Sequence, residues 1–239
     1  MNRLVLMLLK NIHRLPWALG KLWHYAKHTD RYPESESWAH IHRMMQYLPP
    51  AGNVQLQVFG KENLPTDEGF LLCPNHQSLF DAIAISSTCH RPLGVVYKKE
   101  LVNTPVIKQI ALCTRSFAMD REDVRQSLTV IRDVTEQLQA GRSYVIFPEG
   151  TRSRVGNGLQ EFHSGSFRCA VKAKCPVVPA ALIDSYKVLD QKGSQPVTVQ
   201  LHYLPPIRYE EYKTMKTTEL AELVKSRIAE AIALHSKPQ

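Results

Sequence analysis

Short apolar runs the length of β-strands recur between residues 54 and 204, separated by polar turns and by stretches with helical periodicity. The first run, from Val54 to Phe59, has alternating apolar positions, as a half-buried strand does. The other runs cover residues 70–73, 94–97, 117–119, 144–147, 177–182 and 197–204. An alternation of strands and helices along one chain is typical of an α/β sheet. We therefore expect an α/β fold with helices flanking a sheet.

Two stretches carry the clearest helical pattern. One runs from Glu122 to Ala140, with acidic residues in its first turn and Gly141 as its stop. Its apolar stripe has helical spacing and consists of Val124, Leu128, Ile131, Thr135 and Leu138. A second stripe consists of Leu220, Leu223, Val224, Ile228, Ala231 and Ile232. The second stripe predicts a C-terminal helix that closes the domain.

The N-terminal segment differs in character from the rest of the chain. Its apolar residues are interrupted by five positive charges, Arg3, Lys10, Arg14, Lys21 and Lys27. No acid precedes Asp30. No apolar run reaches the roughly 20 residues that a transmembrane helix needs, and no small-residue cleavage site follows the first run, as a signal peptide would require. The pattern indicates a basic amphipathic helical segment.

Trp17, Trp23 and Tyr25 lie within this basic segment. Such a composition resembles that of helices that lie among lipid headgroups, held by their apolar face and by anionic lipids. The alternative is a helix packed on the domain itself. Pro49 and Pro50 precede the first strand-like run. We therefore divide the chain into an N-terminal segment, residues 1–50, and a domain with a C-terminal helix, residues 51–239.

The charge balance indicates an anionic partner. The formal net charge is +8 and the sequence pI is about 9.3, which suits nucleic acid, an acidic membrane or a phosphorylated substrate. No recognised nucleic-acid motif or basic-aromatic platform appears, so we expect no nucleic-acid partner. The five cysteines form no CxxC pair and are odd in number, so we expect buried thiols in a reducing environment and no metal site.

His76 comes directly after a strand-like run that ends at Pro74, where α/β folds form their sites. His76 and Asp81 are five residues apart, and on a continuous helix they would point about 140° away from each other. They can meet only if His76 lies in a loop and Asp81 in the first helical turn. The Asp81 carboxylate would then accept from one imidazole nitrogen and leave the other free to take a proton from an alcohol.

A simpler interpretation of the same residues remains open. Ser78-x-x-Asp81 is also a helix-capping pattern, in which His76 would be an ordinary loop histidine. We expect Ser78 to be the N-cap of a helix that starts near it. It is not a candidate nucleophile, because no Gly-x-Ser-x-Gly turn surrounds it.

A second polar turn follows the run at residues 144–147. Gly150 allows the backbone to approach a ligand closely, and the residues after it offer donors suited to phosphate, namely Thr151, Arg152, Ser153 and Arg154. Arg121 stands after another strand-like run, at residues 117–119. Any one of these arginines alone would be weak evidence for a site.

The combination is more specific. Asn-His-Gln-Ser-Leu-Phe-Asp at residues 75–81, Arg121, Phe-Pro-Glu-Gly-Thr-Arg-Ser at 147–153 and Val-Val-Pro at 177–179 occur in one order along the chain. In order and spacing they resemble the glycerolipid acyltransferase family, and the resemblance to its 1-acyl-glycerol-3-phosphate acyltransferases covers roughly residues 54–205. The HX4D motif followed about 70 residues later by Phe-Pro-Glu-Gly-Thr-Arg is highly specific for this family.

The resemblance implies a fold and an activity. The fold is a mixed α/β sheet flanked by helices. The reaction is transfer of a fatty acyl group from acyl-CoA or an acyl carrier protein thioester to the sn-2 hydroxyl of 1-acyl-glycerol-3-phosphate, or lysophosphatidic acid, giving phosphatidic acid for phospholipid biosynthesis. The thioester is a co-substrate, and no metal or bound cofactor is implied. With the N-terminal segment, the resemblance implies a peripheral or monotopic enzyme at the cytoplasmic face of a membrane that carries anionic lipids.

The resemblance also assigns roles to residues. His76 is implied as the general base, and Asp81 as the group that fixes its tautomer and stabilises the imidazolium. The glycerol-phosphate site is implied to include Arg121, Glu149, Gly150, Thr151 and Arg152. Glu149 is the least expected of these, because an acid beside a phosphate is unfavourable unless it pairs with an arginine or bonds the glycerol portion.

Two departures from the family pattern leave the acceptor's head group open. His163 stands where family members often carry lysine, and Arg115 stands where glycine is common. Other acceptors therefore remain as alternatives, among them glycerol-3-phosphate, another lysophospholipid and a lipid-linked sugar. A non-catalytic lipid-binding protein is a further alternative, against which the intact pair of His76 and Asp81 argues.

Overall fold

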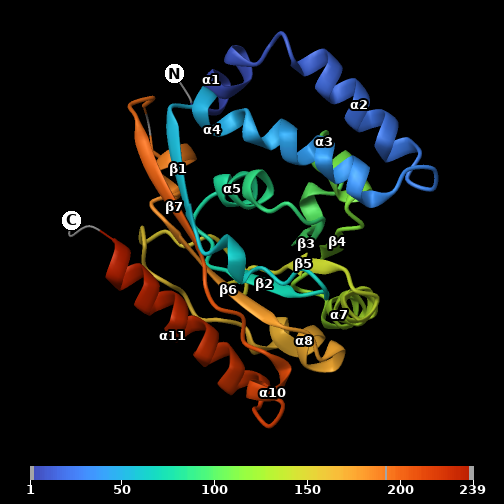
Figure 1. Ribbon diagram of the computed structural model, residues 1–239, viewed down its shortest axis with the longest axis vertical. Helices are drawn as coiled ribbons and strands as arrows, with labels where there is room; N and C mark the ends of the chain where they lie inside the picture. The colour runs from blue at the N-terminus through green and yellow to red at the C-terminus, as the bar shows by residue number, and fades with distance from the viewer. Residues whose placement is uncertain (1–2, 192, 237–239) are drawn as a thin grey trace.

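The computed structural model describes residues 3–191 and 193–236 and is built around one seven-stranded sheet (Figure 1). The strands follow the spatial order β1-β7-β6-β2-β5-β3-β4. Neighbouring strands are parallel, except that β6 and β7 are antiparallel. Their bounds are β1 Val54–Phe59, β2 Leu71–Pro74, β3 Leu93–Lys98, β4 Phe117–Met119, β5 Ser143–Val145, β6 Val177–Ile183 and β7 Val197–Tyr203. The mixed sheet confirms the expected fold class.

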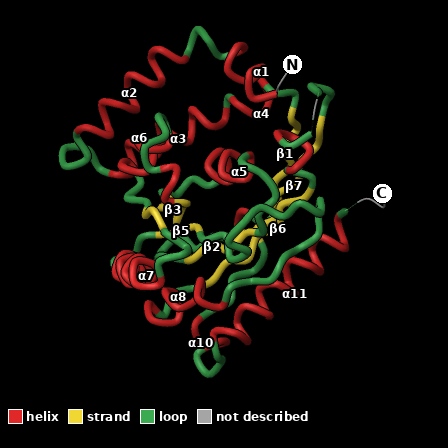
Figure 2. Tube along the Cα trace, turned by 180° about the vertical axis from the view of Figure 1, so that it is seen from behind, coloured by secondary structure: helices red, strands yellow, loops and turns green. Residues whose placement is uncertain are grey.

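Helices cover both faces of this sheet, as the views from opposite sides show (Figures 1 and 2). One face carries α7 (Val124–Gln139), α8 (Arg168–Ala173), α10 (Tyr209–Tyr212) and α11 (Thr217–His235). The other carries α1 (Arg3–Lys10), α2 (Leu15–Lys27), α3 (Glu34–Gln46), α4 (Leu48–Ala51), α5 (Phe80–Thr88), α6 (Ile107–Cys113) and α9 (Tyr186–Leu189). Three short 3₁₀ helices complete the described elements, at Lys61–Asn63, Lys99–Leu101 and Ser164–Phe167.

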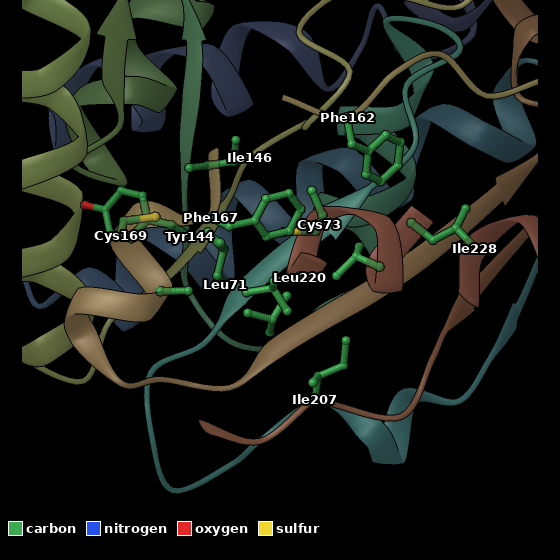
Figure 3. Close-up of a cluster of buried hydrophobic side chains, with 14 of the residues drawn as sticks. Leu71, Cys73, Tyr144, Ile146, Phe162, Phe167, Cys169, Ile207, Leu220 and Ile228 are labelled. Atoms are coloured by element: carbon green, nitrogen blue, oxygen red, sulfur yellow. The ribbon is translucent and has the colours of Figure 1, made fainter. Parts of the chain in front are cut away.

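The central strands are buried on both sides, which explains their uninterrupted apolar sequences. All seven residues of β6 are buried, as expected for a strand with helices on both faces of its sheet. On the side of α11, Leu220 and Ile228 pack with Leu71 of β2 and Tyr144 of β5 in one hydrophobic cluster (Figure 3). The stripe predicted for the C-terminal helix therefore closes this face, although Leu223 is only partly buried. The five cysteines are free and buried, as predicted.

The stripe predicted for α7 is only partly right. Its later positions face the core, but Val124 is 70% exposed and Leu128 is 49% exposed. The first turns of the helix are instead held to β4 and the residue after it by polar side chains. Gln126 Nε2 donates to the carbonyl of Ala118, and Ser127 Oγ donates to the carbonyl of Asp120. These bonds turn Ser127 toward the sheet, so Val124 and Leu128 face away from it.

The N-terminal helices share one core with the sheet. Met7, Leu22 and Ile41 are fully buried and belong to the same cluster as Leu72 of β2 and Phe80 of α5. The first strand begins at Val54. The boundary near residue 50 thus marks the change from the N-terminal helices to the first strand. The helices before it and the sheet after it share one hydrophobic core.

Arg3 is the main correction to the interpretation of the N-terminal segment. The sequence pattern places it among the charges available to a membrane, but its side chain is buried, and Nη1 donates to the carbonyls of Gly52 at 2.8 Å and Gln195 at 2.9 Å. Lys10 Nζ likewise donates to Asn53 Oδ1 at 3.1 Å. These contacts fix α1 to the edge of the sheet. The alternative interpretation, a helix packed on the domain, is therefore correct for one side of this segment.

The other side of the segment is exposed and apolar. Within the described residues, large hydrophobic side chains in contact with solvent are concentrated here, namely Leu4, Val5, Leu8, Leu9, Ile12, Trp17 and Trp23. Across residues 3–191 and 193–236, no helix has both the length and the hydropathy needed to cross a bilayer.

Candidate active site

The candidate site lies where three central strands end. Strands β5 and β6 are both parallel to β2, so their carboxyl ends lie at the same edge of the sheet. The loops that follow these strands carry His76, Glu149 and Ser185. Loops at the carboxyl edge of a parallel sheet are where α/β proteins form their sites. The motifs at residues 75–81 and 147–153 therefore converge at one place.

His76 and Asp81 are in direct contact. His76 Nδ1 lies 2.7 Å from Asp81 Oδ2. His76 lies in the loop, and Asp81 lies in the first turn of α5, which is the arrangement that their spacing requires. Because a carboxylate only accepts, Nδ1 carries the hydrogen, and Nε2 is left free to accept a proton.

The two residues differ in their access to solvent. The His76 side chain is 17% exposed, whereas that of Asp81 is fully buried. The His76 ring also packs against Phe147, with the ring centroids 4.1 Å apart. The imidazole is therefore partly accessible from outside the protein, whereas Asp81 is enclosed.

The capping interpretation and the pairing interpretation are both correct for Asp81. Its Oδ2 accepts from the backbone N–H of Gln77 at 2.7 Å and of Ser78 at 2.9 Å, in addition to the imidazole. Ser78 itself was wrongly predicted as the N-cap. The helix begins at Phe80 after Leu79, and Ser78 Oγ accepts from the Phe80 N–H only at 3.4 Å. The carboxylate closes this turn from within the helix, so the hydroxyl is not needed as a cap.

Glu149 is placed differently from the substrate contact that the resemblance implied. It is 2% exposed, and both carboxylate oxygens accept from backbone groups: Oε1 from the His76 N–H at 2.7 Å and Oε2 from the Gln160 N–H at 2.9 Å. Burial raises the pKa of Glu149, and the two backbone hydrogen bonds oppose this shift without cancelling it. In this geometry Glu149 holds the peptide of His76.

Gly150 and Thr151 form the turn beyond Glu149. Gly150 has a left-handed backbone with φ +69°, and a Cβ there would come within 3.0 Å of the His163 ring. Any other residue would therefore be strained and crowded. The Thr151 side chain is exposed, and its Oγ1 lies 3.3 Å from Gln160 Oε1. The ring of His163, which stands where family members often carry lysine, thus packs directly against this turn.

The two arginines expected to bind phosphate lie at the same edge but not together. Arg152 follows β5 and pairs with Asp190 at 3.2 Å. Both side chains of that pair are over 40% exposed, so the pair contributes little stability and leaves Arg152 available to an anion. Arg121 is exposed and follows β4, which lies three strands from β2. At about 4.8 Å between neighbouring strands, the end of β4 lies roughly 14 Å from the end of β2, the strand that precedes His76.

At Arg115, the second departure, the backbone geometry shows why glycine is common at this position. Its φ is +48°, and it follows the C-terminus of α6. The Ser116 N–H donates to the carbonyl of Ala111, and the Arg115 N–H donates to that of Leu112, which is the Schellman pattern. Glycine is preferred at the position that Arg115 occupies, because it takes this conformation without steric cost.

Two polar side chains at the site were not singled out from the sequence. Ser185 lies directly behind Asp81, where its hydroxyl donates to Asp81 Oδ1, and Gln77 contacts Ser185 in turn. A signal was present: Asp184 and Ser185 are polar residues that follow a seven-residue apolar strand, as His76 and Glu149 follow theirs. His76 was predicted as a site residue because it follows a strand, and Ser185 meets the same criterion.

Fold and site together define an α/β protein with a histidine and aspartate pair at the carboxyl edge of its sheet. The chain belongs to the acyltransferase family, whose model matches residues 55–183, more than half of the 239 residues. His76, Asp81, Arg121, Glu149 and Arg152 lie within the matched region.

Several relatives carry one name. The 1-acyl-sn-glycerol-3-phosphate acyltransferase of Escherichia coli (strain K12) is 31% identical over 160 residues, which cover 66% of this chain and 65% of the relative. That of Cocos nucifera is 24% identical over 220 residues, covering 90% of this chain and 68% of the relative. The chain thus aligns with somewhat less than two thirds of the length of its bacterial relative.

A solved structure shows the same fold over nearly the whole chain. The 1-acyl-sn-glycerophosphate (LPA) acyltransferase PlsC from Thermotoga maritima superposes with a TM-score of 0.75 and 22% sequence identity. The superposition covers 99% of this chain and 98% of that one. The similarity extends to the N-terminal helices as well as the sheet.

Proposed function

We propose that this protein transfers a fatty acyl group from an acyl-CoA or acyl carrier protein thioester to the sn-2 hydroxyl of 1-acyl-glycerol-3-phosphate, giving phosphatidic acid. The observation that carries the proposal is the pair of His76 and Asp81, in which the His76 side chain is partly exposed and Nδ1 faces the buried carboxylate. The names of the relatives supply the acceptor.

Direct attack accounts for the reaction without a covalent enzyme intermediate. His76 Nε2 takes the proton of the sn-2 hydroxyl as its oxygen attacks the thioester carbonyl carbon. The carbon–sulfur bond of the tetrahedral intermediate then breaks, and the imidazolium returns the proton to the leaving thiolate. Asp81 accepts from Nδ1 throughout and stabilises the positive ring that exists between the two steps. The thioester is consumed as a co-substrate.

The acceptor's phosphate is assigned to the arginine side of the site. Arg152 is exposed and only weakly engaged with Asp190, and Arg121 lies at the same sheet edge. Guanidinium groups bind phosphate oxygens through paired hydrogen bonds. Both buried carboxylates lie at His76, so the phosphate is kept away from the histidine and toward the arginines.

An acceptor panel tests the proposed function. Purified protein is given labelled acyl-CoA or acyl carrier protein thioester with lysophosphatidic acid, glycerol-3-phosphate, another lysophospholipid and monoacylglycerol, the last as the acceptor without phosphate. We expect phosphatidic acid as the main product, formed by His76→Ala at less than about a tenth of the wild-type rate. Faster transfer to another acceptor would replace the assignment. Tight binding of lysophosphatidic acid with no transfer would indicate a non-catalytic lipid-binding protein.

We further propose that the N-terminal helices hold the protein at the cytoplasmic face of a membrane without crossing it. Leu8, Leu9, Ile12, Trp17 and Trp23 are between 40% and 61% exposed, which supports burial of this face among lipid chains. The remaining basic residues would contribute up to about 1 kcal/mol each near an acidic surface.

Flotation with vesicles tests the membrane proposal. Replacing Leu8, Leu9 and Ile12 with serine removes exposed apolar surface without touching Arg3 or Met7, which hold α1 to the domain. We expect weaker binding to phosphatidylglycerol vesicles and lower activity on acceptor embedded in bilayers, with activity on detergent-dispersed acceptor retained. The control replaces Val124 and Leu128, which are also exposed apolar residues, on α7. Equal flotation of wild type and the N-terminal variant would refute the proposal.

A further inference from the structure

Asp81 has a second oxygen that the contact with His76 does not use. Oδ2 already accepts from the imidazole and from two backbone N–H groups. Oδ1 instead accepts from the hydroxyl of Ser185, the second residue after β6. Both Asp81 and Ser185 are 0% exposed, so solvent cannot supply this hydrogen bond if the hydroxyl is removed.

The direction of this hydrogen bond follows from the surrounding groups. The Ser185 hydroxyl has one hydrogen and two acceptors within reach, Asp81 Oδ1 and, at 3.1 Å, Gln77 Oε1. Gln77 Oε1 already accepts from the backbone N–H of Ser185 at 3.0 Å. An ionised carboxylate is also the stronger acceptor. The hydroxyl hydrogen therefore goes to Asp81.

The orientation of Gln77 is fixed independently. Its Nε2 donates to Asn157 Oδ1 at 2.9 Å, and that same oxygen accepts from the Asp184 N–H at 2.8 Å. Asn157 Nδ2 in turn donates to Asp184 Oδ1 at 3.0 Å. Each amide thus has a single orientation that satisfies the backbone donors. The network joins the loops after β2, β5 and β6 and places Ser185 against Asp81.

We propose that Ser185 is a positioning residue for acyl transfer, acting through Asp81. The torsion that rotates a carboxylate about its own axis has no sharp minimum, so its hydrogen bonds set it. Without the Ser185 hydroxyl, Oδ1 would be a buried oxygen that has lost its donor, and rotation of the carboxylate toward another donor would pull Oδ2 away from the imidazole. With Ser185 on Oδ1, the carboxylate keeps Oδ2 directed at His76 Nδ1. The inference rests on the proposed function, because the base that Asp81 orients is the one assigned there.

The kinetic test uses Ser185→Ala with Ser185→Thr, which keeps the hydroxyl. The matched control is Ser87→Ala, because Ser87 is a buried serine on the same helix as Asp81 but donates to the Ala84 carbonyl at 2.9 Å. We expect Ser185→Ala to lower kcat about tenfold to a hundredfold, the range of one hydrogen bond to a charged group. KM for both substrates should stay within about twofold, as should kcat of the threonine and control variants.

A double-mutant cycle separates positioning from a general packing role. In the Asp81→Asn background, Ser185→Ala should lower kcat by no more than about twofold, because the group it acts through is already altered. Multiplicative losses would overturn the proposal, as would a Ser185→Ala enzyme indistinguishable from Ser87→Ala. Melting temperatures show whether each variant is folded.

A substrate-free measurement makes the result independent of the acceptor. In protein labelled with ¹⁵N-histidine, the Nδ1 proton of His76 is assigned by its loss in His76→Ala. We expect Ser185→Ala to shift or broaden this resonance, with Ser87→Ala leaving it unchanged. An unchanged resonance in Ser185→Ala would overturn the inference. If lysophosphatidic acid were not an acceptor, the proposed function would fail while this readout still decided the role of Ser185.

Discussion

Replacing Glu149 with glutamine should separate stability from activity. The carboxylate is buried and accepts from the backbone N–H groups of His76 and Gln160. Glutamine has the same shape and no charge, but its amide offers one acceptor where the carboxylate offers two. One of the two N–H groups would therefore face an NH₂ group, while the cost of burying a charge would disappear.

The two effects on the free energy of unfolding oppose each other. An unsatisfied buried donor costs about 1–3 kcal/mol. Because burial raises the pKa of Glu149, ionisation of this group costs the folded state more than the backbone hydrogen bonds return. The stability that it contributes is present below its unfolded pKa of about 4.3 and is lost as pH rises through the raised folded value. At pH 7 we therefore expect glutamine to be within about 1 kcal/mol of wild type, or roughly 2–4 °C in Tm.

Activity should respond differently, because the peptide of His76 loses a charged acceptor. A small displacement of a reacting group is costly, up to about a hundredfold for 1 Å, and we expect kcat to fall about tenfold or more. Glu149→Ala leaves both N–H groups unpaired and should lose about 2–6 kcal/mol. The control is Glu161→Gln, in the same loop with an 83% exposed side chain paired with Lys225.

Thermal melts from pH 4 to pH 8 and steady-state kinetics check this reasoning. Relative to Glu149→Gln, wild type should lose stability as pH rises across that range. A glutamine variant as unstable at pH 7 as the alanine variant would show that the buried charge carries no net cost. Unchanged kcat would show that Glu149 does not hold His76 in place.

Three further results are expected. His76→Ala should retain less than about a tenth of the wild-type rate, with Tm unchanged, since general-base catalysis contributes roughly 10²- to 10⁴-fold; Asp81→Asn should also lose most activity. Arg152→Ala and Arg121→Ala should each raise KM for the phosphorylated acceptor about tenfold or more, because a charged hydrogen bond is worth roughly 1.5–3 kcal/mol. KM for the thioester should stay unchanged, and equal effects on both substrates would remove the phosphate assignment. Arg115→Gly should raise Tm by up to about 4 °C with kcat unchanged, because the left-handed backbone conformation costs a residue with a side chain about 1 kcal/mol that glycine does not incur. A fall in Tm would contradict that reasoning.

The sequence predicted those features that depend on neighbours along the chain. The strand-like runs became strands because each is a short apolar segment between turn residues, and β4 has the predicted bounds. The contact between His76 and Asp81 was also local, since only a loop followed by a helical turn brings residues five apart together. Periodicity and spacing were sufficient for both.

Features that depend on distant segments were not predicted. Arg3 appeared to be a surface cation, yet it donates to the carbonyl of Gln195, 192 residues away. Ser185 lies 104 residues from Asp81. Val124 and Leu128 continue an apolar stripe, but hydrogen bonds to β4 decided which side of α7 faces the sheet. A single sequence contains the residues of such contacts and no sign of their pairing.

The placement of two buried carboxylates at one histidine has a consequence for substrate orientation. Asp81 binds the ring of His76 and Glu149 binds its peptide N–H, so in the proposed reaction both carboxylates would stabilise the imidazolium. The same charges repel a phosphate, which cannot sit against His76 without a compensating cation. Arg152 and Arg121 are exposed at the same sheet edge, where a guanidinium can pair with phosphate. In the proposed reaction, an acceptor with its phosphate toward the arginines would therefore present its hydroxyl to His76, and the reversed orientation would be disfavoured electrostatically.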